Sequence, residues 1–353
     1  MTWPGPPLSG DQADIIGLVD AIVGKHGAAP QDEYPAEVAK ARQALADAGL
    51  WTLGAAEDAG GGGAPLPLML AFLASAGRHW AALAWASAQA HAAIEVLGGD
   101  PAWGELTQRL SDGSAIACVV DRDSSRVSLT SEDGRVSGTI SRLDPAGTAP
   151  HVILLTGDAT AWVLTPQALA FGPVLRRSGL AGACTIAAQV ADATPAVIGG
   201  VRVAEVRARL QVAGAAIAAG LCADAAEQSL RYARSRVQFG APLTALATVR
   251  QALARQAADA ATALAVLHDT DLPAPVDAAA ILADNCERAV SVTAVAVQIH
   301  GGYGYLAEYG VERLVRDAIS LRAATDADGG ARAAAALLAG YPAGDTDVRQ
   351  ARR

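Results

Sequence analysis

The feature that most constrains the fold is the spacing of apolar residues, which changes twice along the chain. Up to about Leu110 they recur at intervals near 3.6 residues, as in the run from Ile15 to Val23. Short alternating runs replace this pattern from about Ser114, and the helical interval returns near Val201. Intervals near 3.6 and near 2 mark one face of a helix and one face of a sheet. The sequence therefore predicts two helical parts with a β-domain between them.

The two helical parts are rich in alanine, the best helix former, and only 4% of all residues are aromatic. Small side chains suit closely packed helices. Residues 60–63 are all glycine and interrupt the helical pattern. The expected helices are Asp11–Lys25, Pro35–Ala48, Leu66–Leu97, Val201–Val237, Thr244–His268, Pro273–Ile299 and Tyr309–Ser320. We expect the last four to form a four-helix bundle.

The middle part has the pattern of a set of strands. Asp133-Gly134 separates two alternating runs, and this pair tolerates the positive backbone angles of a tight hairpin turn. The expected strands are Ala115–Val120, Arg126–Thr130, Arg135–Ser141, His151–Thr156 and Ala161–Leu164. The predicted fold is mainly α with a central β-barrel or β-sandwich. Its predicted domains are 1–113 (helical), 114–200 (β) and 201–353 (four-helix bundle).

Charge and cysteine spacing exclude several classes of function. The net charge is −9, and no run of lysine and arginine is long enough to follow a track of phosphates, so nucleic-acid binding is not expected. The four cysteines are far apart and lack the spacing of a zinc site, which suits a reducing cytoplasm without a metal centre. The apolar run Leu210–Ala223 stops at Asp224, short of the about 20 residues that a membrane span needs.

A first candidate motif closes the long helix that begins near Val201. Residues 234–243 read Arg-Ser-Arg-Val-Gln-Phe-Gly-Ala-Pro-Leu, so an arginine, a glutamine and an aromatic residue precede a Gly-x-Pro turn. Alone, the segment fits two interpretations. It is either a ligand-binding element or an ordinary helix end in which arginines complement the helix dipole and Gly240 is the cap.

A second candidate motif is glycine-rich. Residues 296–306 read Ala-Val-Gln-Ile-His-Gly-Gly-Tyr-Gly-Tyr-Leu. Gly301, Gly302 and Gly304 would end a helix and let the backbone approach a ligand or another chain closely. Gln298 would offer donor and acceptor groups on the last turn. A plain corner between two helices would also use glycines, so both interpretations stay open.

The two motifs follow a helical part and a β-domain and lie about 60 residues apart, and in this arrangement the chain resembles the acyl-CoA dehydrogenases. The family's Arg-x-x-Phe-Gly motif matches residues 236–240, and its Gln-x-x-Gly-Gly-x-Gly-Tyr motif matches residues 298–305. Its Glu-Arg and Arg-Asp pairs match Glu312-Arg313 and Arg316-Asp317. The likeness covers nearly the whole chain.

The resemblance implies FAD as cofactor, bound mainly by the neighbouring subunit across a dimer interface. The residues implied to contact its pyrophosphate and adenosine are Arg236, Gln238, Phe239, Gln298, Gly301 and Gly302. This chemistry is sensible, because a guanidinium pairs with phosphate through charge-assisted hydrogen bonds and glycines expose backbone N–H groups to the same anion. Oligomerisation would then be required for the site.

At the flavin ring the family pattern is lost. Members carry Val-Thr-Glu-Pro followed by Gly-Ser-Asp, and later Trp-x-Thr, whereas residues 118–125 here read Cys-Val-Val-Asp-Arg-Asp-Ser-Ser. Val120 stands in place of the first threonine and has no hydroxyl. Arg142 stands in place of the tryptophan, and Asp144 in place of the second threonine. None of these replacements conserves the chemistry.

The catalytic glutamate of the family is also missing. Thr325 stands at its usual position after the Arg-Asp pair, and threonine is no general base at neutral pH. Asp326 would take the role only after a slip of one residue, and its side chain is one methylene shorter, an error of position that costs rate. Leu210 stands where some relatives carry the glutamate on the long helix. Asp326 is therefore the one candidate base.

Both motifs that contact the neighbouring subunit's FAD are present, whereas the flavin-ring pattern and the catalytic glutamate are missing. This asymmetry predicts a subunit of a heteromeric FAD-dependent acyl-CoA dehydrogenase. It would desaturate an acyl-CoA thioester in lipid metabolism, steroid side-chain thioesters included, as do actinobacterial α2β2 assemblies whose shorter subunit lacks the base. The partner would supply the glutamate, the flavin-ring contacts and the substrate pocket. Two alternatives stay open: a self-sufficient or repurposed flavoenzyme of this fold, working as a homo-oligomer, and a structural protein without cofactor.

Several conspicuous residues have ordinary explanations. His79, His91 and His268 are expected on the surface or as satisfied core residues. Asp326 and Asp328 are expected in a solvated loop. Residues 60–63 lack the lysine and serine of a phosphate-binding P-loop, so no nucleotide is assigned to them.

Overall fold

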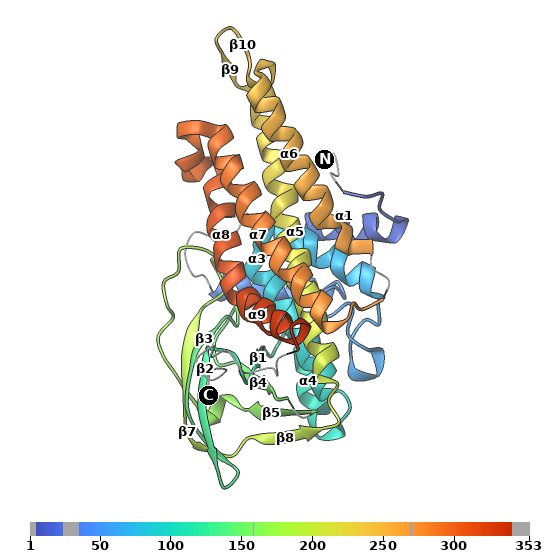
Figure 1. The fold of residues 1–353 in the computed structure, drawn as a ribbon. Coiled ribbons are helices and arrows are strands. Elements are labelled where there is room, and N and C mark those ends of the chain that lie inside the picture. The colour runs from blue at the N-terminus through green and yellow to red at the C-terminus, as the bar shows by residue number, and fades with distance from the viewer. Residues whose placement is uncertain (1–4, 24–34, 158, 269–270, 341–353) are drawn as a thin grey trace, which may run out of the picture.

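The computed structural model describes residues 5–23, 35–157, 159–268 and 271–340 (Figure 1). Its helices are α1 (Gly10–Val23), α2 (Pro35–Asp47), α3 (Leu66–Leu97), α4 (Gly104–Ser111), α5 (Val203–Ser235), α6 (Ala247–Leu264), α7 (Pro275–His300), α8 (Val311–Ala324) and α9 (Ala327–Leu338). The last two residues of the expected helix Asp11–Lys25 lie outside the described residues. The predicted fold class, mainly α with a central β-domain, is confirmed.

The β-domain is a sandwich of two four-stranded sheets, with orders β1-β4-β5-β8 and β2-β3-β7-β6. Its strands are β1 (Ala117–Asp121), β2 (Val127–Glu132), β3 (Arg135–Leu143), β4 (His151–Leu155), β5 (Thr160–Leu164), β6 (Leu169–Phe171), β7 (Ile186–Ala193) and β8 (Ala196–Gly199). Side chains of both sheets, among them Val120, Ile140 and Leu154, share one apolar core. Asp133 and Gly134 have φ of 49° and 75°, which confirms the predicted hairpin turn.

Small residues let the central helices α3 and α5 pack very closely. A Cβ on Gly220 would lie 2.1 Å from the carbonyl oxygen of Ala74, and one on Gly77 would lie 3.0 Å from Ile217. Neither position tolerates a larger residue without movement of the backbone. The alanine and glycine enrichment therefore serves helix packing. Of the described helices, α5 alone is long and apolar enough to cross a membrane by length and composition, and 83% of that apolar window is buried inside the protein, as in a core helix.

Helix α9 corrects the expected solvated loop around Asp326 and Asp328. The chain passes through a left-handed conformation at Asp326 (φ 51°, ψ 39°), and α9 begins at the next residue. Asp328 lies in the first turn, where a carboxylate complements the helix dipole, and it pairs with Arg322 at 2.8 Å. Gly329 and Gly330 are weak helix formers, but the alanine-rich residues that follow sustain the helix.

Helix α5 connects two very different ends of the molecule. Its first turns lie beside the β-domain, and its last turn leads into a small hairpin of β9 (Val237–Gln238) and β10 (Ala241–Pro242). This hairpin projects from the end of the bundle opposite the β-domain (Figure 1). The first candidate motif therefore lies far from the strands of its own chain.

Candidate functional site

The first motif forms the projecting hairpin. Helix α5 ends at Ser235, and its cap is Arg236 in an extended conformation, so the interpretation of Gly240 as a helix cap is wrong. Phe239 and Gly240 have φ of 54° and 79° and make the turn between β9 and β10. A positive φ is unusual for a bulky residue, and Phe239 is 93% exposed. An aromatic side chain held in this way on a projecting turn is suited to contact another molecule.

The second motif ends α7 with glycines that face open space. Gly301 has φ 60° and ψ −137°, a conformation that glycine adopts readily and other residues rarely. A Cβ added at Gly301 or Gly302 would meet no atom of the chain within 4 Å. Gly304 differs, since its Cβ would lie 2.5 Å from the carbonyl oxygen of Val297. Packing within the chain therefore accounts for Gly304 but not for the exposed pair.

The fold brings the two motifs together at the projecting end of the bundle. The Arg236 guanidinium lies over the Tyr303 ring at 4.9 Å from its centroid. In the amide orientation that satisfies both groups, Gln238 accepts a hydrogen bond of 2.8 Å from Arg236. Gln298 is exposed on the last turn of α7. Tyr303 was not among the predicted site residues. It lies in the second motif and is the residue that contacts Arg236 of the first motif.

Arg236 carries the charge that an anionic ligand would meet at this end. It forms no ion pair with any carboxylate of the described residues. The hydroxyl of Tyr232, one turn earlier on α5, donates to the carbonyl oxygen of His300 at 3.3 Å, and the two rings stack at 4.2 Å. These contacts fix the end of α5 against the end of α7. The guanidinium and the exposed backbone of Gly301 and Gly302 could hold a diphosphate together.

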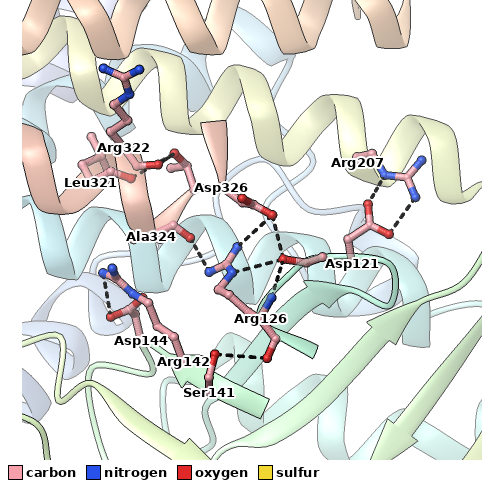
Figure 2. A network of polar contacts seen from close by, with 12 residues as sticks. Asp121, Arg126, Ser141, Arg142, Asp144, Arg207, Leu321, Arg322, Ala324 and Asp326 are labelled. Atoms are coloured by element: carbon pink, nitrogen blue, oxygen red, sulfur yellow. Dashed lines mark hydrogen bonds and ion pairs between the residues drawn. The ribbon is translucent and has the colours of Figure 1, made fainter. Parts of the chain in front are cut away.

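At the β-domain end of α5, the side chains at the positions that face the flavin ring in the family contact other residues of this chain. Val120 is 5% exposed and packs into the core of the sandwich. Arg142 donates to both oxygens of Asp144, at 2.6 and 3.2 Å, and both side chains are buried (Figure 2). Arg142 also donates to the carbonyl oxygen of Ser320 at 3.3 Å, which ties the sandwich to α8.

Further buried polar groups complete this network. Thr185 donates to the Asp144 carboxylate at 2.5 Å. Gln89 of α3 donates to the Asp144 carbonyl oxygen at 3.0 Å and accepts from the Val119 backbone at 3.3 Å. A buried ion pair is stable only when such additional hydrogen bonds satisfy its remaining groups. Arg142 and Asp144 are therefore structural partners of each other.

The two positions at which family members carry the catalytic glutamate hold Thr325 and Leu210, and both side chains pack inside this chain. The Thr325 hydroxyl donates to the Leu321 carbonyl oxygen at 2.9 Å and lies 4.0 Å from the Cys286 sulfur. A Cβ on Gly214 would lie 2.9 Å from Thr325, so the threonine side chain packs against α5. Leu210 packs against the apolar core. Neither position carries a group that could remove a proton.

The carboxylate of the candidate base Asp326 already has partners within the chain. Its carboxylate accepts from Ser124 at 2.7 Å and lies 3.8 Å from the Arg126 guanidinium, which also donates to the Ala324 carbonyl oxygen at 3.0 Å (Figure 2). Ser124 and Arg126 follow β1, about 200 positions earlier in the chain. Nothing in the sequence indicated this contact, because the strand–helix junction brings the two segments together only in the folded chain.

The two ends are separated by most of the length of α5. Arg207, near its start, pairs with Asp121 next to Val120 at 2.5 and 3.1 Å (Figure 2). From Arg207 to Arg236 the chain rises by roughly 40 Å at 1.5 Å per helical residue. This exceeds the length of an extended FAD molecule. One FAD could not contact both ends of a single chain.

The residues present thus fit one end of FAD and not the other. The half-buried Arg236 and the exposed glycines suit its diphosphate, whereas Val120 and the Arg142–Asp144 pair leave no complement to its ring. Among the described residues no cluster of three or more histidine, cysteine or acidic side chains could hold a metal ion.

His91 and His79 have structural roles. His91 is buried, accepts from the Gly54 backbone at 3.0 Å and contacts the Ser87 carbonyl oxygen at 2.8 Å, so it is a satisfied core residue. Burial lowers its pKa to about 4. His79 lies 2.7 Å from Asp20.

Comparison with known proteins identifies the bundle. Residues 199–328 match the family "Acyl-CoA dehydrogenase, C-terminal domain". Acryloyl-CoA reductase (NADH) of Anaerotignum propionicum is 37% identical over 117 residues, which is 31% of this chain and 29% of that protein. The curated relatives are thus matched over less than a third of their own length.

Solved structures match over nearly the whole chain. The complex of glutaryl-coenzyme A dehydrogenase with glutaryl-CoA has a TM-score of 0.82 at 19% identity and covers 97% of this chain and 98% of its own. The ChsE4-ChsE5 complex from Mycobacterium tuberculosis has a TM-score of 0.77 at 22% identity, covering 96% and 99%. At these identities the likeness establishes the fold.

The comparisons confirm the resemblance drawn from the two motifs. Relatives are named as acyl-CoA dehydrogenases and reductases, and one structural neighbour of 17% identity, PigA, is described with FAD. The chain has the acyl-CoA dehydrogenase fold, and its residues 199–328 match the acyl-CoA dehydrogenase C-terminal domain family.

Proposed function

We propose that this chain is a subunit of a heteromeric FAD-dependent acyl-CoA dehydrogenase that contributes cofactor contacts in trans and lacks a catalytic base. The observation that carries the proposal is the separation of the two ends of α5. The end that suits a diphosphate projects away from its own β-domain, so only the FAD of another subunit could reach it (Figure 1). The end that would hold a ring is closed by buried polar pairs.

Each residue that matches the two motifs would have a specific part in this role. Arg236 would pair with the diphosphate, and the backbone N–H groups around Gly301 and Gly302 would donate to the same oxygens. Phe239 would pack against the partner subunit, since its side chain is almost fully exposed. FAD would supply the hydride acceptor for the β carbon of the thioester, and the partner's glutamate would take the α proton. This chain would supply affinity and rigidity.

The likeness to the ChsE4-ChsE5 complex supports a partner of unlike sequence, because that neighbour is itself a complex of two differently named chains. The partner would then carry the glutamate and the flavin-ring contacts. Steroid side-chain thioesters remain one predicted substrate among acyl-CoA thioesters, and the cytoplasm remains the predicted location.

The test is to purify the chain alone and together with an acyl-CoA dehydrogenase subunit encoded beside it, and to measure native mass and visible absorbance. We expect colourless protein alone and a yellow complex whose flavin absorbance is bleached by an acyl-CoA without oxygen. A yellow homo-oligomer bleached by acyl-CoA would contradict the proposal and support a self-sufficient enzyme. A colourless protein in every combination would support the structural alternative.

A further inference from the structure

Tyr303 joins the two motifs and is not one of the six predicted FAD contacts. The Arg236 guanidinium lies over its ring, at 4.9 Å from the centroid. A cation in this position is attracted by the electrons of the ring face. Arg236 carries a long side chain, which loses considerable rotamer freedom whenever it is held in one conformation. The contact with Tyr303 therefore restrains the side chain that would meet an anionic ligand.

The ring of Tyr303 is itself held by a cluster of aromatic side chains. The Tyr309 ring lies 5.3 Å from that of Tyr303. The same Tyr309 ring is nearly perpendicular to the rings of Tyr232 and His300, at 6.1 and 6.3 Å, as in favourable edge-to-face pairs. The carbonyl oxygen of Tyr232 accepts from the Arg236 backbone N–H at 2.9 Å. The contacts therefore lead from the Arg236 side chain through the cluster back to the Arg236 backbone, and fix one relative to the other.

The restraint leaves most of the hydrogen-bonding capacity of Arg236 free. In the amide orientation given above, the oxygen of Gln238 accepts from Nε at 3.3 Å and from Nη2 at 2.8 Å. A guanidinium has five N–H groups, so two are used by Gln238 and three remain. No carboxylate in the described part of the chain pairs with them. Since the contact with Tyr303 requires no oxygen acceptor, it holds the guanidinium and still leaves these donors available.

We propose that Tyr303 is a positioning residue for the cofactor diphosphate. Its ring holds the Arg236 guanidinium in the binding conformation before FAD arrives, so that binding has one flexible side chain fewer to order. This inference rests on the proposed function and deepens it, because Tyr303 acts through Arg236 and needs no contact of its own with FAD. The expected gain in FAD affinity is about fivefold, the scale of ordering one long side chain.

The experiment is a double-mutant cycle on the complex with the partner subunit, with FAD affinity measured by flavin fluorescence. The cycle compares the unsubstituted chain, Tyr303→Leu, Arg236→Ala and the two changes together. Tyr303→Leu should weaken FAD binding about fivefold when Arg236 is present and less than twofold when it is absent. Tyr303→Phe keeps the ring and should stay within about twofold of the unsubstituted complex. Tyr303→Gln is a second variant without a ring, for use if the leucine variant does not fold.

A second measurement needs no cofactor and no partner. In the full chain alone, prepared with isotope-labelled arginine, the nuclear magnetic resonance of the Arg236 Nε–H group is assigned by its loss in Arg236→Ala. The ring current of Tyr303 should shift this resonance, because the guanidinium lies over the ring. The shift should persist in Tyr303→Phe and disappear in Tyr303→Leu. This readout reports the position of the guanidinium, which a general effect on folding would not reproduce.

The outcomes separate this proposal from the proposed function. An equal loss of FAD affinity with and without Arg236 would overturn the positioning role, because Tyr303 would then act independently of the guanidinium. Unchanged affinity in Tyr303→Leu would overturn it as well and leave the proposed function standing. An Arg236 resonance that Tyr303→Leu does not move would show that the ring does not hold the guanidinium, whatever the FAD affinity. A complex that binds no FAD in any form would overturn the proposed function and the positioning role together.

Discussion

The two ends of α5 differ in whether their polar groups have partners within the chain. At the projecting end, Arg236 has no carboxylate partner among the described residues, and the backbone of Gly301 and Gly302 faces open space. At the β-domain end, the Arg142–Asp144 pair is buried and satisfied by further hydrogen bonds. In a ligand-binding site some polar groups have no hydrogen-bond partner within the protein, whereas in a structural junction the buried polar groups bond to one another. Under the proposed function, the projecting end is the part of a cofactor site that this chain would supply, and the β-domain end is a structural junction.

The largest effect is expected at the closed end. Asp144→Ala should lower the free energy of unfolding by about 3–5 kcal/mol, because it leaves the Arg142 guanidinium buried without its partner. Urea unfolding of the purified chain measures the change. Glu205→Ala, which breaks an exposed pair with Arg202, should produce no resolvable change. A loss below 1 kcal/mol for Asp144→Ala would show that the junction is not closed as described.

At the projecting end, a substitution should change FAD affinity much more than the free energy of unfolding. Arg236→Ala should weaken FAD binding by the complex about 30-fold, or about 2 kcal/mol, the scale of a hydrogen bond to a charged group. Its free energy of unfolding should fall by no more than about 1 kcal/mol, because Arg236 forms no ion pair in the described part of the chain and loses only an exposed cation–π contact with Tyr303 and a hydrogen bond to Gln238. FAD fluorescence quenching gives the affinity, with Arg234→Ala as the neighbouring control. Undiminished FAD affinity would remove Arg236 from the site.

A third prediction concerns the interior beside the β-domain. The pKa of His91 is lowered to about 4 from an ordinary value of 6.5, so the folded state holds it neutral while the unfolded state binds a proton as pH falls. Its contribution to stability is present above pH 6.5 and is lost as pH falls toward 4. Between pH 7 and 5 the free energy of unfolding should fall by about 2 kcal/mol from this residue. The same pH dependence in His91→Gln would contradict this assignment.

The smallest effect is expected at Asp326. Asp326→Asn should change turnover of the complex less than twofold and stability by at most about 1 kcal/mol, because its ion pair with Arg126 is partly exposed. Steady-state kinetics and urea unfolding check the two halves of the statement. A fall in turnover of 100-fold or more would make Asp326 the base and favour the self-sufficient alternative.

The sequence predicted the elements well but not the contacts that close the β-domain end. Helix Leu66–Leu97 and the Asp133-Gly134 turn follow from local periodicity and turn chemistry, so both were predictable. Both motifs were found, since each lies in one continuous segment. The contact of Ser124 and Arg126 with Asp326 was not, because it joins segments about 200 residues apart. Helix α9 was not predicted, because Asp326 and Asp328 were expected in a solvated loop; two glycines in its first turn also lower its helix propensity.

The most direct test of the central claim is the number of FAD molecules per chain. Equilibrium dialysis of the chain alone, and of its complex with the partner subunit, gives this number at saturating FAD. The account predicts none for the chain alone and one per unlike pair in the complex, because each FAD needs the projecting end of this chain and the ring site of the other. Two FAD per unlike pair, or one per chain in the isolated protein, would contradict it, since the β-domain end described here would then have to hold a flavin ring.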